Sequence, residues 1–185
     1  MNFNLTDEQA AIQNSAREFL EKEAKNLARE TEESEEGYSP EIWRKIADLG
    51  WMGISFPEEY GGSGGDFVDL IVVLEEMGRA LVPGPFIPSV ICSGHAILQY
   101  GSEEQKEEFL PKLTKGELII TPAIIEPRSL KGREGVKDRV DVEKGDYILS
   151  GNRLFVPYAH LADWLIYSAE TDKGKSLFLV NTKDR

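Results

Sequence analysis

Apolar residues recur every three or four positions through the first two-thirds of the chain, which is the spacing of amphipathic helices. Thr6 and Gln9 have the spacing of a capping box, in which two side chains satisfy backbone donors at a helix start. The apolar stripe after this start consists of Ile12, Ala16, Phe19, Leu20, Ala24 and Leu27. Ser39 and Pro40 open a second helix, because proline at the first helical position loses no hydrogen bond. This pattern predicts helices up to about residue 116.

Turn residues divide this helical part into segments. Residues 30–37 are acidic without an apolar period, which predicts a solvated connector, and residues 56–65 contain four glycines and a proline, which predicts an irregular loop. Asp66 is expected to cap a third helix, and a fourth is predicted over about residues 87–99. A second capping box, from Ser102 to Gln105, predicts the start of a fifth.

The apolar period changes near Leu118 to the alternation expected of strands. Strands are predicted over residues 118–125, 140–142, 147–149, 154–156, 164–169 and 176–180. The chain is therefore expected to have an α+β fold, with an all-helical N-terminal domain over residues 1–116 and a mostly antiparallel β-domain over residues 117–185. The last strand would leave an unpaired sheet edge, so the β-domain is expected to be incomplete.

Composition narrows the range of partners. A formal net charge of −12 disfavours nucleic acid and anionic lipid surfaces, both of which attract basic patches. The longest strongly apolar stretch, Leu70 to Leu74, is too short to span a bilayer. The single cysteine, Cys92, cannot form an internal disulfide and fits a reducing cytoplasm. Because His95 and His160 are scattered in the sequence, no metal site is predicted.

Four sequence strings resemble the acyl-CoA dehydrogenase family. The most specific is the glycine-rich loop of residues 53–64, which reads GISFPEEYGGSG. The others are the helix start at residues 5–9, the helix and turn at residues 100–117, and the hairpin segment at residues 151–163. Together the four strings are distributed over nearly the whole chain, and on them it is identified as similar to this family.

The resemblance implies α,β-dehydrogenation of an acyl-CoA thioester by a flavoprotein that contains FAD. In the family a glutamate removes the α-proton and the β-hydrogen leaves as hydride to the flavin, which lies between the β-domain and a C-terminal four-helix bundle. The usual glutamate comes from that bundle, which these 185 residues do not include. No catalytic residue is therefore assigned, and the resemblance implies that the chain alone is inactive. It also implies a homo- or hetero-oligomer.

The resemblance places the flavin contacts at Ile125 and Glu126 in a first loop, and at Phe155 and Val156 in a second. Both loops depart from the family pattern, because Ile125 replaces a threonine and Pro157 replaces a hydroxyl residue near the flavin ring. Backbone N–H groups of the first loop are still available in principle, but proline has none to offer. Flavin binding by this chain is therefore expected to be weakened or absent.

Two other interpretations remain open. The lost hydroxyl groups favour a non-catalytic subunit that pairs with a complete acyl-CoA dehydrogenase and shapes its substrate pocket. Alternatively, the chain belongs to a relative that uses flavin differently, such as an acyl-CoA oxidase or a flavin monooxygenase. The acyl chain length and the electron acceptor have no sequence signal here.

Overall fold

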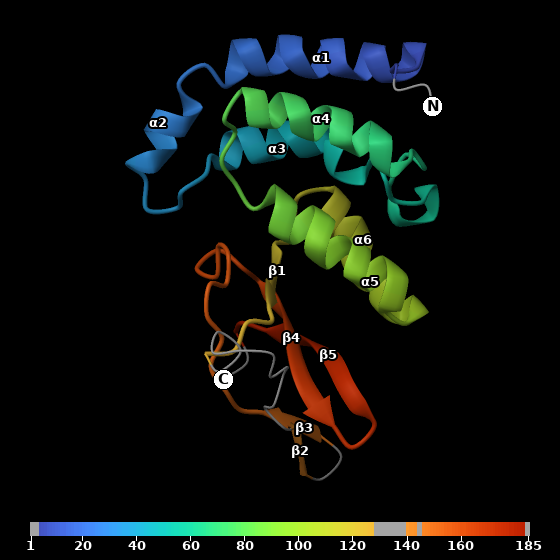
Figure 1. Cartoon of the computed structure of the whole chain (residues 1–185), viewed down its shortest axis with the longest axis vertical. Helices are drawn as coiled ribbons and strands as arrows, with labels where there is room; N and C mark the ends of the chain where they lie inside the picture. Colours follow the sequence, from blue (N-terminus) through green and yellow to red (C-terminus); the bar gives the residue numbers. More distant parts are fainter. Residues whose placement is uncertain (1–3, 128–139, 144–145, 184–185) are drawn as a thin grey trace.

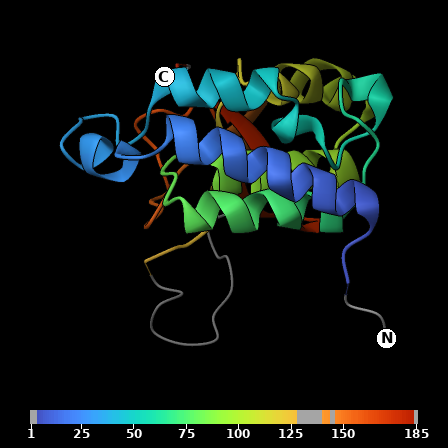
Figure 2. The ribbon, with the colours of Figure 1, turned by 90° about the horizontal axis from the view of Figure 1, so that it is seen from above.

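The computed structural model describes residues 4–127, 140–143 and 146–183. Helices occupy one end of the molecule and strands the other (Figure 1). The long helices of the outer layer are α1 (Asp7–Glu23), α3 (Pro40–Asp48) and α4 (Phe67–Arg79). Seen from above, α1 lies across α3 and α4, and α2 (Leu27–Glu32) projects to one side (Figure 2). The helices η3 (Ile87–Gly94), α5 (His95–Tyr100) and α6 (Glu103–Thr114) lie between this layer and the strands.

The predicted helix starts are confirmed. Thr6 forms a reciprocal capping box with Gln9, and Ser102 forms one with Gln105. Asp66 caps α4 through its carboxylate, which accepts hydrogen bonds from two backbone N–H groups. Pro40 is the first residue of α3, as its missing N–H allows. The glycine-rich segment is irregular apart from the short helices η1 (Trp51–Gly53) and η2 (Glu58–Tyr60).

Two helical predictions need correction. The acidic connector begins later than expected, because α2 extends to Glu32 and buries Thr31, whose hydroxyl donates to the carbonyl of Leu27. The predicted fourth helix is not α-helical throughout, since η3 is a π-helix that continues directly into α5. Within it the Ser93 hydroxyl donates to the Pro88 carbonyl, five residues earlier, which matches the wider π-helical turn.

The strands form a three-stranded sheet and a separate hairpin. The sheet has the order β1 (Ile120–Ala123), β4 (Trp164–Thr171), β5 (Gly174–Asn181), and the hairpin joins β2 (Val140–Glu143) to β3 (Asp146–Leu149). The predicted antiparallel pairing is confirmed for β2 with β3 and for β4 with β5. In contrast, β1 pairs in parallel with β4. The long connection between these two strands permits the crossover that parallel pairing needs.

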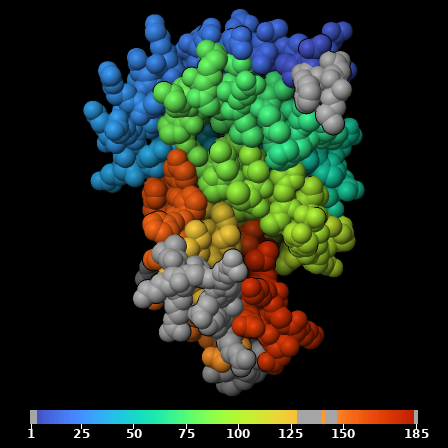
Figure 3. Space-filling model, in the orientation of Figure 1, coloured from blue at the N-terminus to red at the C-terminus, as the bar shows by residue number. Residues whose placement is uncertain are grey.

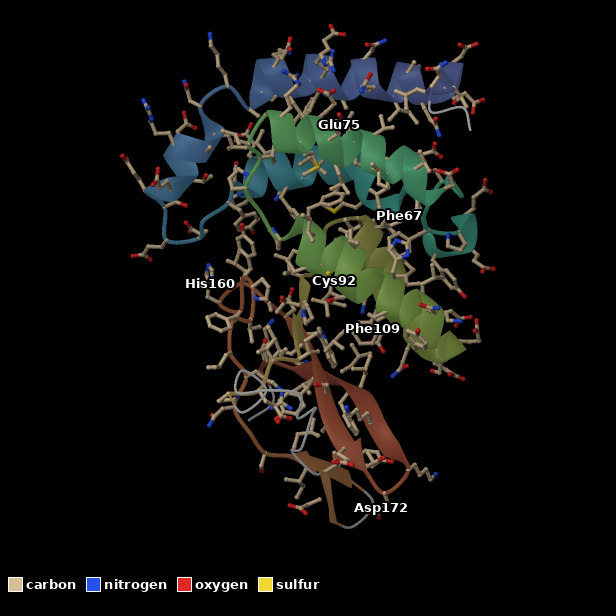
Figure 4. The ribbon with its side chains drawn as sticks, viewed as in Figure 1. Phe67, Glu75, Cys92, Phe109, His160 and Asp172 are labelled. Atoms are coloured by element: carbon tan, nitrogen blue, oxygen red, sulfur yellow. The ribbon has the colours of Figure 1, made fainter. Side chains whose placement is uncertain are left out.

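One apolar core runs from the helices into the sheet. Ile120 and Ile166 belong to the same buried cluster as Leu110 and Leu113 of α6. Phe109 points from α6 toward the sheet (Figure 4), and its ring meets that of Trp164 edge to face with 4.9 Å between centroids. The sheet is therefore packed directly on the helices. No helix in the described part of the chain is long and apolar enough to cross a membrane.

Candidate functional site

Two irregular segments lie side by side at the end of the sheet. The first loop, residues 124–127, follows β1, and the second loop, residues 150–157, leads toward β4. They are joined directly, because the backbone N–H of Leu154 donates to the carbonyl of Ile125 at 2.8 Å. The structure thus brings together the two segments in which the family resemblance implies flavin contacts. The prediction of a strand at residues 154–156 is wrong, since this segment has no strand structure.

Phe155 explains why a strand does not form in the second loop. Its backbone has a φ of +53°, a left-handed conformation that L-residues adopt at an energetic cost of about 1–2 kcal/mol. Its side chain is 73% exposed, which is unusual for an aromatic ring in a segment held in place by hydrogen bonds. Val156, in contrast, packs against the buried cluster of Ala123, Tyr167 and Ala169. The strained backbone therefore presents the Phe155 ring to solvent.

The first loop has an exposed side and a buried side. Ile124 is 49% exposed and Ile125 is half-buried, whereas the Glu126 side chain is turned inward and buried. Glu126 Oε1 lies 3.6 Å from Nη2 of Arg153, whose side chain is equally buried. The Glu126 carboxylate therefore forms an ion pair beneath the loop.

Arg153 is the residue that the sequence reasoning missed. Its Nε donates to the carbonyl of Ala123 at 3.1 Å, so it connects the second loop to the end of β1. The available signal was charge: Arg153 directly precedes the apolar run of residues 154–157, and Glu126 directly follows the apolar run of residues 123–125. Because lone charges in buried segments are usually paired with each other, the two could have been matched.

The second loop is also attached to the helices. The hydroxyl of Tyr158 accepts a hydrogen bond from the backbone N–H of Gly84 at 3.0 Å. Thr121 of β1 donates through its hydroxyl to the carbonyl of Pro157 at 2.7 Å. His160 is exposed and places Nε2 3.1 Å from the carbonyl oxygen of Glu36 on the helical side (Figure 4). The C-terminal end of the loop that carries Phe155 is thus fixed to β1 and to the helical part.

Polar side chains on the helices form a smaller cluster away from the two loops. Oγ of Ser55 lies 2.9 Å from Nε2 of His95, and burial lowers the pKa of this histidine. The His95 ring stacks on Phe56 and meets the edge of Phe67. Cys92 is exposed on η3 (Figure 4). Within the described ranges, no group of histidine, cysteine and carboxylate side chains could hold a metal ion.

The chemistry of the two loops fits one wall of a flavin site. An exposed aromatic ring suits the face of a flat heteroaromatic group, and irregular backbone beside it can offer N–H donors. Positions 125 and 157 hold isoleucine and proline, so neither position offers the side-chain hydroxyl of the family pattern. The arrangement supports stacking and backbone contacts more strongly than side-chain hydrogen bonding.

Comparison with known proteins adds independent findings. The family model described as acyl-CoA dehydrogenase, N-terminal domain, matches residues 6–117. The short-chain specific acyl-CoA dehydrogenase of Clostridium acetobutylicum is 37% identical over 97% of this chain, which corresponds to 49% of that protein. The chain thus spans about half the length of this curated relative.

Solved structures agree with the sequence matches. The ChsE4-ChsE5 complex from Mycobacterium tuberculosis contains a chain that matches with a TM-score of 0.88 and 28% identity, covering 100% of this chain and 50% of that one. Butyryl-CoA dehydrogenase from Megasphaera elsdenii matches with a TM-score of 0.81 and 32% identity, covering 99% of this chain and 50% of that one. The space-filling view shows the wide helical end and narrower strand end of the matched fold (Figure 3).

Proposed function

The chain belongs to the acyl-CoA dehydrogenase family, and we propose that it supplies the N-terminal helices and one flavin-facing wall of an enzyme that α,β-dehydrogenates an acyl-CoA thioester. The observation that carries this proposal is the contact between the two loops, with the exposed Phe155 ring beside the first loop. We also retain the proposed division into a helical domain, residues 1–116, and the start of a β-domain, residues 117–185.

Each loop has a distinct role in the proposed site. Bound FAD would supply the electron sink for the reaction. Phe155 would contact the flavin ring by stacking, and Val156 would hold the loop beneath it. Ile125 and Glu126 would contribute backbone N–H groups, because backbone donors do not depend on the identity of the side chain.

The changes at positions 125 and 157 weaken this proposed site. Each hydrogen bond lost to a buried polar partner costs roughly 1–3 kcal/mol. Two such losses lower affinity about a hundredfold or more, since about 1.4 kcal/mol corresponds to tenfold. We therefore expect FAD to bind these 185 residues weakly and to be lost when free FAD is removed.

The chain on its own is expected not to dehydrogenate acyl-CoA. A general base must reach the proton that it removes, and no residue of this sequence matches the family's catalytic glutamate. The test is to incubate the pure protein with FAD, desalt it, record the visible spectrum and add acyl-CoAs of several chain lengths with an artificial acceptor. A protein with about one flavin per chain that is bleached by acyl-CoA would contradict this expectation.

A non-catalytic subunit is the second candidate. Two observations favour it: the residues at 125 and 157 lack hydroxyls, and a matched structure is described as a ChsE4-ChsE5 complex. Mixing the chain with a complete acyl-CoA dehydrogenase from the same source separates the two candidates. A stable complex with altered acyl-chain preference, from a chain that never retains flavin, would favour the subunit.

A further inference from the structure

Arg153 belongs to the second loop, and its side chain reaches the first loop and the end of β1. Its side chain is only 4% exposed, as is the side chain of Glu126. Nε donates to the carbonyl of Ala123 at the end of β1, and Nη1 donates to the carbonyl of Asn152 in the second loop at 3.0 Å. Nη2 lies 3.6 Å from the Glu126 carboxylate in the first loop. One guanidinium group therefore reaches both loops.

The same guanidinium is also fixed to the sheet. Nη2 donates to the carbonyl of Ser168 in β4, and the carbon of the guanidinium lies 3.8 Å from the centroid of the Tyr167 ring. Tyr167 is itself buried, so its ring gives the cation a rigid surface. Arg153 is thereby held against the sheet while its donors point to both loops.

We propose that Arg153 is a positioning residue for the flavin site. Its guanidinium sets the spacing between the first loop, with the backbone donors of Ile125 and Glu126, and the second loop, with the ring of Phe155. The inference rests on the proposed function, because it holds that the spacing between the two loops serves to bind a flavin. Arg153 acts through the loops, and its own side chain lies beneath them.

The geometry requires arginine in particular. The planar guanidinium has five N–H donors in a fixed fork, and here they reach three carbonyls and approach one carboxylate. Lysine has a single ammonium group at the end of a flexible chain, so it cannot reach the same carbonyls at once. Replacement by lysine keeps the positive charge beside Glu126, but it should lose one or more of the hydrogen bonds to the carbonyls of Ala123, Asn152 and Ser168.

The first test observes the second loop without any flavin. Replacing Phe155→Trp and labelling with 5-fluorotryptophan gives a reporter at position 155, beside the natural Trp43, Trp51 and Trp164. We expect Arg153→Met and Arg153→Lys, in this background, to shift or broaden the ¹⁹F signal of position 155. The signals of Trp43 and Trp51, in the helical part, should stay unchanged.

Arg17→Met is the matched control, because it also removes a guanidinium from a buried carboxylate, that of Glu76, but in the helical layer. It should leave the position-155 signal unchanged. An unchanged signal in Arg153→Met would overturn the proposal. Equal changes in all four signals would overturn it too, by showing a general loss of fold. Full restoration by lysine would contradict the requirement for the guanidinium fork.

The second test measures FAD at equilibrium by quenching of flavin fluorescence. We expect Arg153→Met and Arg153→Lys to raise the Kd at least tenfold, and Arg17→Met to leave it within twofold. Equal Kd values in the parent and both Arg153 variants would refute a positioning role. If the parent binds no FAD, the proposed function fails, while the ¹⁹F result still decides whether Arg153 fixes the loops.

Discussion

Glu76 is a buried carboxylate that joins two helices of the outer layer. It is 1% exposed, and it accepts hydrogen bonds from Arg17 of α1 and from Arg79 of α4. Hydrogen bonds from Arg17 first, and then from Arg79, lower the pKa of Glu76 from its ordinary value of 4.5 to about 2, against the opposing effect of burial. The carboxylate is therefore charged at every pH at which the helices would normally be studied.

The depressed pKa of Glu76 predicts a pH-dependent stability. Because the folded-state pKa lies below the unfolded one, the pair stabilises the protein above about pH 4.5, and this stabilisation is lost as pH falls toward 2. We expect Arg17→Met to lower the free energy of unfolding by roughly 1–3 kcal/mol at pH 7 and by less at pH 3. Urea unfolding at both pH values measures the difference. Arg44→Met, at an exposed site of α3, is the control, and a pH-independent loss in Arg17→Met would refute the account.

Leu81 occupies a position that usually suits glycine. It follows the end of α4 with a φ of +53°, and the N–H groups of Leu81 and Val82 donate to the carbonyls of Gly78 and Met77. These two bonds form a Schellman motif, in which Leu81 is the left-handed residue. Its side chain is 70% exposed and gives little packing in return for the strain.

Leu81→Gly is expected to stabilise the chain by about 0.5–1 kcal/mol, since relief of left-handed strain exceeds the added entropy of the unfolded state. Leu49→Gly provides the matched comparison, because Leu49 is also an exposed leucine at a helix end but has a φ of −75°. There the same change should destabilise by about 0.5–1 kcal/mol. Denaturant midpoints of the two variants should therefore move in opposite directions, and movement in the same direction would argue against strain at Leu81.

At the residue scale, the sequence located the candidate site but did not give its geometry. The strings around Ile125 and Phe155 identified the two loops, because similarity to a family is local. The left-handed backbone of Phe155 and the ion pair of Glu126 with Arg153 belong to contacts between segments that are distant in sequence. The spacing of apolar residues along the chain therefore predicts neither the backbone conformation of Phe155 nor the orientation of Glu126.

The glycine-rich loop is the element in which close backbone packing matters most. A Cβ on Gly62 would lie 2.0 Å from the carbonyl oxygen of Phe56, whereas a Cβ on Gly78 in α4 would have nothing within 4 Å. Gly62→Ala is expected to destabilise by several kcal/mol, roughly 3 or more, because backbone must move. Gly78→Ala should instead stabilise by about 0.5–1 kcal/mol, because Gly78 lies within the last turn of α4, where alanine has the higher helix propensity. Thermal melts compare them, and a tolerated alanine at position 62 would show that the loop adapts.

At the element scale, features formed by residues close in sequence were predicted correctly, and features formed by distant residues were not. Helix starts at Thr6, Asp66 and Ser102 were predicted correctly because a capping residue and its partner lie within three residues. The parallel pairing of β1 with β4 was not predicted. Its paired residues, such as Ile120 and Trp164, lie far apart in the sequence. Alternation identifies a strand but not the direction of its neighbour.

At the scale of the whole molecule, the helical part leaves apolar side chains exposed. Phe67, Val68 and Ile71 of α4 are each about half exposed, and Ile87 at the start of η3 is 58% exposed. Contiguous apolar residues on a protein surface commonly meet a partner. Because each copy carries a net charge of −12, two copies repel each other, and salt screens this repulsion.

We therefore expect the chain to self-associate, and more strongly at high salt than at low salt. The double variant Val68→Glu with Ile71→Glu should remain monomeric, while Tyr147→Glu, an exposed aromatic of the hairpin, should associate like the parent. Light scattering over a concentration series gives the mass. A strict monomer at high concentration that also binds no apolar dye would contradict this expectation.

The proposed function requires that the two loops form one wall of a flavin site. The most direct test is an equilibrium titration of FAD with the parent chain, Phe155→Ala and the control Tyr147→Ala. We predict weak, saturable binding to the parent and the control, and a roughly threefold to tenfold weaker Kd in Phe155→Ala, as loss of one stacking contact implies. FAD binding that does not change in Phe155→Ala, or a parent chain that does not bind FAD at all, would contradict the account.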